Sequence, residues 1–197
     1  MSKTRLFLAF VFASALLVPA ANAGTFTFGL TAGASLPMGD YGDVAKTGWD
    51  GGVFGDYWVT NQFGIGADVV YNSSKFDADG TPLEDESVNM IQMGGHLKWM
   101  FPMTGSAMAP WLQAGAGAYN VGSSVEGSDS ETKFGFNLGA GLNFWGNDMM
   151  SLGLAGTYHN VMDAMTDSDG DETSASYINV GLNLTFSTTG TSSMGSK

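Results

Sequence analysis

Four ionisable residues in the first half of the chain have the types and spacing of a paired charge network. Asp56 and Asp68 are carboxylates, and His96 and Lys98 lie two residues apart. Residues two apart in an extended strand lie on the same face, so His96 and Lys98 would share one side of a sheet. Buried charges must be paired. We therefore predict that these four residues form a salt-bridged polar network, with a proton- or ion-conducting path as the alternative.

His159 is the one residue that hints at catalysis. It stands in a Tyr-His-Asn sequence, and a histidine can activate a nearby serine hydroxyl as a general base. The residue two positions further is Val161, which has no hydroxyl. Ser151 lies on the same face of the predicted strand, but it is roughly 26 Å away along an extended chain. The pair is incomplete, so we predict no catalytic residue and no enzyme.

The acidic run Asp-Ser-Asp-Gly-Asp at 167–171 begins like a calcium-binding loop. The complete EF-hand pattern would need glycine where Glu172 stands and glutamate where Ile178 stands. The motif therefore fails, and we predict no cofactor and no defined metal site. A solvated acidic loop is the favoured interpretation, and loose binding of divalent cations by clustered carboxylates is the alternative.

The elements that would position these residues are strands. In the stretch 134–145, FGFNLGAGLNFW, every second residue from Phe134 to Phe144 is apolar, and the residues between them are Gly or Asn. A period of two is the strand period. The same alternation recurs along the chain, and it is least regular where Phe54 and Trp58 fall among polar neighbours. It predicts eight strands, at 25–36, 48–60, 63–75, 87–101, 109–123, 134–145, 150–162 and 174–186.

The connections between these strands alternate between short and long, and the acidic residues gather in the long ones. The chain has 7 Lys and Arg against 19 Asp and Glu, a net charge of −12. Fifteen of the 19 acids fall in the segments 37–47, 76–86, 125–132 and 163–173. An up-and-down meander would place all four segments at one end. A nucleic-acid partner is not expected, because phosphate binding needs a basic surface.

The first 23 residues predict a secretory signal peptide. Lys3 and Arg5 precede the apolar run 6–17, and Ala21-Asn22-Ala23 fits a small-residue cleavage site. The run is shorter than the roughly 20 residues that a spanning helix needs. The predicted organisation is a signal peptide at 1–23, a barrel domain at 24–186 and a flexible periplasmic tail rich in Ser, Thr and Gly at 187–197.

The length and composition of the strands favour a barrel in a membrane. A strand of about 12 residues, tilted by about 40°, covers on the order of 30 Å, enough for the ~25 Å apolar band of an outer-membrane barrel. Closure removes the sheet edges that lipid would not tolerate. The alternative is a secreted barrel of the lipocalin kind with its apolar face inward. Its outer face would then be Gly, Asn and Thr with few Lys or Glu, which is unusual for a surface in water.

The predicted fold is therefore all-β: an eight-stranded antiparallel up-and-down transmembrane β-barrel. Its apolar face would meet lipid, and its small polar face would line a lumen just wide enough for side chains to fill. Asp56, Asp68, His96 and Lys98 would then project into the lumen. Aromatic residues near the strand ends are typical of interfacial girdles. These are Phe26, Tyr57, Phe63, Trp99, Phe101, Phe134, Phe144 and Phe186.

The chain resembles the small outer-membrane β-barrel proteins of Gram-negative bacteria, including the OmpX-like proteins. The resemblance covers nearly the whole chain after residue 23. It is carried by the segments LPMGDYGD, KTGWDGGVFGDY, FGIGADVVY, PWLQAGAGAY, FGFNLGAGLNFW and YINVGLNLTF. The family implies a location in the cell outer membrane, with both termini in the periplasm and long loops at the cell surface. It also implies insertion by the outer-membrane assembly machinery, which reads a final strand ending in an aromatic residue, here Phe186.

The functional expectation is a monomeric barrel with acidic surface loops and a structural or interaction role in the cell envelope. Its partners would be outer-membrane lipids and lipopolysaccharide, with divalent cations between the acidic loops and the anionic lipid. The alternative is a narrow porin-like channel for ions or small solutes. A lipid-modifying enzyme is the third possibility, since the Tyr-His-Asn around His159 resembles part of the barrel lipid A deacylases, in which a serine follows where Val161 stands.

Overall fold

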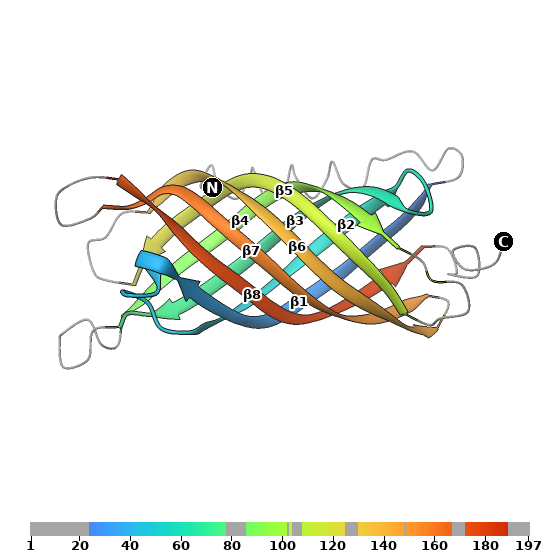
Figure 1. Cartoon of the computed structure of the whole chain (residues 1–197), viewed down its shortest axis with the longest axis horizontal. Helices are drawn as coiled ribbons and strands as arrows, with labels where there is room; N and C mark the ends of the chain where they lie inside the picture. The colour runs from blue at the N-terminus through green and yellow to red at the C-terminus, as the bar shows by residue number, and fades with distance from the viewer. Residues whose placement is uncertain are drawn as a thin grey trace, which may run out of the picture.

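The computed structural model is an eight-stranded barrel that closes on itself (Figure 1). It describes residues 24–77, 86–101, 103, 108–124, 130–147, 149–166 and 172–188. The strands are β1 Thr25–Met38, β2 Gly48–Trp58, β3 Phe63–Lys75, β4 Ser87–Met100, β5 Met108–Ser123, β6 Glu131–Asn147, β7 Met150–Thr166 and β8 Glu172–Ser187. A 3-10 helix, η1 Gly39–Tyr41, follows β1. In the described part of the chain, no helix is long and apolar enough to cross a membrane.

Each strand pairs antiparallel with the next one in the chain, and β8 pairs antiparallel with β1. The order is the up-and-down meander that the alternation predicts, and all eight predicted strands are confirmed. The last strand is longer than predicted: Ser187 still belongs to β8, and the Thr188 amide donates to the Phe26 carbonyl oxygen at 3.0 Å. The predicted signal peptide, the tail from 189 onward and the acidic run 167–171 lie outside the described residues.

The apolar face of the sheet points outward, as predicted, and the polar face points into the lumen. Five leucines at mid-strand positions are each about half exposed: Leu30 at 53 %, Leu112 at 53 %, Leu138 at 54 %, Leu154 at 50 % and Leu182 at 51 %. Residues of the opposite parity, which point inward, include the buried amides of Asn72, Gln92, Asn137 and Asn179. This is the reverse of a barrel that is soluble in water. The lipocalin-like alternative is therefore wrong.

Two strands near the long-loop end run further than the hydrophobic pattern predicts. β6 begins at Glu131 rather than at residue 134, and β7 continues to Thr166 rather than ending at residue 162. The register between β7 and β8 shifts between Val161 and Met165, and Asp163 there has a positive φ of 53°. Beyond the lipid, a strand needs only a pairing partner and no outward apolar residue. The apolar pattern therefore ends before the hydrogen-bonded ladder does.

Aromatic rings gather in contact on the outer surface near the strand ends. Near the chain termini, the ring centroids of Phe28 and Phe186 are 5.5 Å apart. Phe63 and Trp99 form a similar pair at 5.9 Å. Towards the long-loop end, the Trp49 ring lies 5.3 Å from Tyr71. Such bands are typical of the two membrane interfaces, so the span between them is the part of the wall that faces lipid.

The outward face gives a direct test of where lipid lies. Leu154 faces outward in the lipid-facing part of β7, and it pairs with the outward Leu142 and Leu182. We expect Leu154→Arg to destabilise the barrel by about 2–4 kcal/mol, because a charge on the lipid face near the bilayer centre is costly. Met38→Arg, at the long-loop end of β1, is the matched control and should cost about 0–1 kcal/mol. Urea unfolding in lipid vesicles, followed by the gel mobility of the folded barrel, measures both values, and equal costs would contradict this placement.

Candidate functional site: the barrel interior

The four residues predicted to form a network come from three neighbouring strands. Asp56 is on β2, Asp68 on β3, and His96 and Lys98 on β4. The pairing register sets Asp56 opposite Gly66 and Gly66 opposite His96. All four side chains point into the lumen, where Asp56, His96 and Lys98 are 1 %, 4 % and 7 % exposed. The structure therefore brings together all four predicted residues.

The contacts in this network run in an unbroken chain. His96 Nε2 lies 2.7 Å from Asp56 Oδ1, and His96 Nδ1 lies 2.8 Å from Asp68 Oδ1. Lys98 Nζ donates to Asp56 Oδ2 at 2.8 Å, and Gln92 Nε2 donates to Asp68 Oδ2. Both imidazole nitrogens thus face carboxylate oxygens, which is the arrangement of an imidazolium that donates on both sides. In that state two carboxylates are balanced by two cations.

Gly66 provides the space that the network occupies. A Cβ atom at this position would collide with Asp56 Oδ1, His96 Nε2 and the Gly55 carbonyl oxygen. Because the lumen of an eight-stranded barrel is only as wide as its side chains, the row between Asp56 and His96 must contain a residue without a side chain. The glycine is therefore part of the site.

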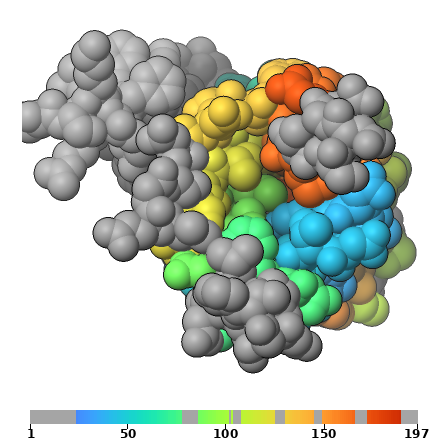
Figure 2. All heavy atoms as spheres, turned by 90° about the vertical axis from the view of Figure 1, so that its left-hand side faces the viewer, coloured from blue at the N-terminus to red at the C-terminus, as the bar shows by residue number. Residues whose placement is uncertain are grey.

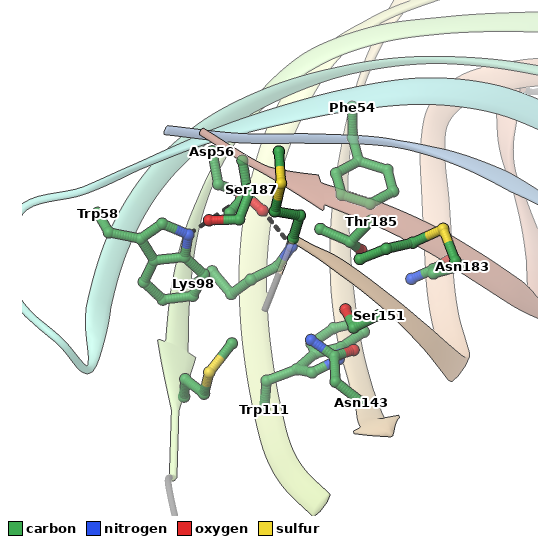
Figure 3. A pocket seen from close by; sticks show the side chains of 14 residues that line it. Phe54, Asp56, Trp58, Lys98, Trp111, Asn143, Ser151, Asn183, Thr185 and Ser187 are labelled. Carbon is green, nitrogen blue, oxygen red and sulfur yellow. Dashed lines mark hydrogen bonds and ion pairs between the residues drawn. The ribbon is translucent and has the colours of Figure 1, made fainter. Parts of the chain in front are cut away.

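Aromatic residues enclose the network on the side of the short turns (Figure 3). Lys98 Nζ lies 4.9 Å from the centre of the Phe54 ring and 5.0 Å from that of Trp111. Trp111 Nε1 donates to Asn143 Oδ1 at 3.0 Å, and Trp58 Nε1 donates to Thr27 Oγ1 at 3.0 Å. A cavity of about 20 Å³ remains among these side chains, which is room for about one water molecule.

A second apolar cluster closes the other end of the lumen. The cluster consists of Tyr41, Ala45, Met90, Tyr119, Val161, Ala175 and Tyr177. Tyr41 and Ala45 come from the segment after β1, which lies over one side of the long-loop end (light blue in Figure 2). Burial raises the pKa of the Tyr41 hydroxyl to about 12, so the ring is neutral where it packs edge-on against Tyr177 with 6.4 Å between centroids.

His159 is part of this closed end. Its ring stacks on Tyr177 at 4.6 Å, with 8° between the planes, and its Nδ1 lies 3.0 Å from the Tyr119 hydroxyl. Val161, the residue at the position where a serine would be needed, is fully buried in the apolar cluster. Ser151 lines the cavity at the opposite end of the lumen. The structure thus does not bring a serine hydroxyl to His159 among these residues.

A cavity of about 60 Å³ lies between the network and the apolar cluster, with room for a few water molecules. Four residues line both this cavity and the smaller one, namely Phe54, Lys98, Trp111 and Asn183. Lys98 and its two aromatic neighbours therefore form the partition between the two halves of the lumen.

The sequence predictions for the site omitted several residues of the lumen wall. Asp50, Phe54 and Trp58 share the inward face with Asp56, because all four have the same parity on β2. That parity is visible in the sequence, but the aromatic residues there obscure it. Trp111 has the same parity as Gln113 on β5 and is buried to 4 % exposure. Parity on an irregular strand is the signal that would have found these residues.

The buried network should be far more important to stability than a surface pair. Asp56→Ala would leave Lys98 and His96 without their shared carboxylate, and breaking a buried pair in this way costs about 3–5 kcal/mol. Asp77→Ala is the matched control: Asp77 lies 3.5 Å from Lys46 with both side chains well exposed, and such pairs contribute about 0–1 kcal/mol. Urea unfolding of both variants in detergent measures the difference. Similar losses would mean that the network is not a stabilising element.

Two glycines offer a second comparison with the same chemical change. Gly66→Ala places a methyl group against Asp56 and His96, whereas Gly156→Ala, on the outer face of β7, meets nothing within 4 Å. We expect the first variant to lose stability and the second to be neutral or slightly more stable, because alanine reduces the freedom of the unfolded chain. Thermal unfolding, followed by the loss of the gel band of the folded barrel, measures both variants. A Gly66→Ala barrel as stable as the unmodified one would contradict the tight packing described here.

Comparison with solved structures finds the same architecture in small outer-membrane proteins. The structure of Neisserial surface protein A matches with a TM-score of 0.61 and 14 % identity, over 84 % of this chain and 99 % of that one. Ail of Yersinia pestis, solved in complex with the heparin analogue sucrose octasulfate, matches with a TM-score of 0.53 and 16 % identity, over 84 % and 100 %. OprG from Pseudomonas aeruginosa gives 0.53 and 14 %, over 83 % and 96 %. At these identities, the likeness concerns the fold.

Comparison with curated protein sequences finds no match. A family model does match, and it spans residues 8–186, which is most of the chain. Its description, an outer membrane protein beta-barrel domain, agrees with the closed barrel and the outward apolar face. This chain belongs to the outer membrane protein beta-barrel domain family.

Proposed function

We propose that this protein is an outer-membrane barrel with a closed lumen, and that its role is exercised at its acidic surface end. The observation that carries this proposal is the filling of the lumen. An ion-paired network occupies the middle of the lumen. Trp58 and Trp111 close the short-turn side, and the apolar cluster around Tyr177 closes the long-loop end. The two remaining cavities are about 20 and 60 Å³. Such an interior supports a structural or interaction role in the envelope rather than transport. The barrel acts as a monomer after insertion by the outer-membrane assembly machinery.

The long-loop end supplies the chemistry for an interaction. Its described acids are Asp40, Asp43, Asp77, Glu86, Glu131, Asp163 and Glu172. They outnumber the described cations at the same end, which are Lys46, Lys75 and Lys133. Carboxylates of this density repel anionic lipid unless hard cations lie between them, and oxygen ligands suit Mg²⁺ and Ca²⁺. The partner we propose is therefore lipopolysaccharide, bridged through divalent cations.

The relatives do not suggest a different ligand for this end. The Yersinia protein Ail was solved with a sulfated heparin analogue, which is a polyanion. A polyanion matches the acidic rim of this chain poorly, because like charges repel when they are close. A catalytic role is also not proposed, since His159 is buried within the lumen and the lipid lies outside the barrel wall.

The second candidate function is a narrow channel, and one observation favours it. The two cavities share a wall formed by Lys98, Phe54 and Trp111, so movement of one long side chain would join them. Lysine has a flexible stem of four carbons. In this alternative the cation–π contacts and the Asp56 pair act as a gate, and ions or small solutes would pass when it opens.

Conductance in planar bilayers distinguishes the two functions. We expect the unmodified barrel to give no steady conductance. The double variant Asp56→Asn, Lys98→Ala removes the charge pair together and joins the two cavities. It should still not conduct if the cluster around Tyr177 closes the long-loop end, and it conducts if the partition is the gate of a channel. The control Asp56→Asn, Lys98→Met keeps the volume of the partition and should remain closed. Steady conductance of the unmodified barrel that disappears with Lys98→Met would establish the channel instead.

The lipopolysaccharide proposal has its own test. The purified barrel in detergent should retain lipopolysaccharide in the presence of Mg²⁺, and lose most of it when EDTA replaces Mg²⁺ at equal ionic strength. The triple variant Asp40→Asn, Asp43→Asn, Asp163→Asn removes three exposed charges and should weaken retention severalfold. Retention that is unaffected by EDTA and by the triple variant would contradict the proposed cation bridge.

A further inference from the structure

Asp50 is the one lumen carboxylate that the ion-paired network leaves unbalanced. The network pairs Asp56 and Asp68 with His96 and Lys98. Asp50, on β2, is 4 % exposed, and no Lys, Arg or His among the described residues forms an ion pair with it. Its Oδ1 is buried without a hydrogen-bond partner. A buried carboxylate in this state carries a large desolvation cost unless something neutralises it.

The oxygen of Asp50 is not the only unpaired acceptor in its surroundings. Gln92 Oε1, Asn179 Oδ1 and Asn183 Oδ1 are also buried without partners. All four residues line the same cavity of about 60 Å³. The cavity thus gathers one carboxylate and three amide oxygens without a donor. Asn137 on its wall has both side-chain atoms unpaired, and Nδ2 of Asn72, the residue paired with Asp50, is unpaired as well. Such groups in a folded protein require an explanation, for which an unseen water or ion is the usual one.

The orientation of the Gln92 amide is fixed by the partner of its nitrogen, and Asn179 also uses its nitrogen. Gln92 uses its Nε2 to donate to the carboxylate of Asp68, and a carboxylate in an ion pair can only accept. Its Oε1 is therefore the free end. Asn179 donates from Nδ2 to Asn72 Oδ1 at 2.8 Å, which leaves its own Oδ1 unpaired. The hydrogen bond to Asp68 therefore determines which atom of Gln92 is free.

We propose that this cavity binds a monovalent alkali cation, Na⁺ or K⁺, with Asp50 as its charged ligand and the amide oxygens of Gln92 and Asn179 completing the site together with water. Carboxylate and amide oxygens are ligands of hard cations. The charge balance favours a monovalent ion, because a single positive charge makes the lumen neutral. Among the described residues, no group of three His, Cys, Asp or Glu side chains is arranged to hold a metal ion, so a site for a transition metal is not what this cavity offers.

The other ionisable groups at the cavity wall do not replace this ion. Asp68, His96 and Lys98 are engaged in the network. His159 also lines the cavity, but its ring stacks on Tyr177 and its Nδ1 is 3.0 Å from the Tyr119 hydroxyl. A proton on Asp50 is the competing means of neutralising the carboxylate, and it would make the barrel indifferent to the identity of the salt.

The test compares thermal unfolding of the barrel in detergent in NaCl, KCl and N-methylglucamine chloride at equal ionic strength. A ligand that binds only the folded state raises the melting temperature, so the unmodified barrel should melt several degrees higher in NaCl or KCl. Asp50→Asn keeps the shape of the side chain and removes the charge, and it should abolish the difference. Asp43→Asn, an exposed carboxylate on the loop after β1, should keep it. An unmodified barrel that melts equally in all three salts, or an Asp50→Asn barrel that keeps the difference, would overturn the proposal.

Two further measurements decide the matter if Asp50→Asn does not fold. Asn179→Ala removes one proposed oxygen ligand and should reduce, without abolishing, the difference between salts. Crystals of the unmodified barrel soaked in Tl⁺, a heavy substitute for K⁺, should show anomalous density beside Asp50 and Gln92. Anomalous density absent from this cavity, with Asn179→Ala unchanged in its salt dependence, would mean that the cavity holds only water.

Discussion

The width of the lumen is the constraint on which the rest of this structure depends. Eight strands close into a barrel whose interior side chains meet across it, so an inward residue must either fill space or leave it for a neighbour. Gly66 leaves the space in which Asp56 and His96 touch, and a Cβ atom there would collide with both. Gly141 has the same relation to the Trp111 ring. The glycine-rich inward face is thus the counterpart of the few large side chains that fill the interior.

Charge balance follows from the same constraint. A lumen of this width has little water to solvate an ion, so each charge must have a partner within reach. His96 satisfies two carboxylates at once because its ring nitrogens point in opposite directions. Lys98 adds a second contact to Asp56 and lies against two aromatic rings, which stabilise a cation by their electron-rich faces. Asp50 lies outside this arrangement, and that is why its cavity is chemically different from the network beside it.

Much of the fold could be predicted from the sequence, because a period of two assigns each residue to lipid or lumen without knowledge of its partners. The apolar outward face, the eight strands and the inward direction of Asp56, Asp68, His96 and Lys98 all follow from parity. Parity does not contain the register of the strands, that is, how far each strand is shifted along its neighbour in the barrel wall. That Asp56 meets His96 depends on how each strand is offset against its neighbour. The closure of the long-loop end by Tyr41 was also out of reach, since an irregular segment after β1 has no period to follow.

The interior makes stability and permeability opposed properties in this barrel. The residues that separate the two cavities are also those that neutralise one another, since Lys98 is at once the partition and the partner of Asp56. Any movement that joins the cavities must therefore uncover a buried carboxylate, which is costly in a medium of low dielectric constant. A pore in this scaffold would need a replacement cation at Asp56 each time it opened. A filled barrel avoids that cost, and it leaves the segments beyond the membrane as the part of the chain that can vary without disturbing the interior.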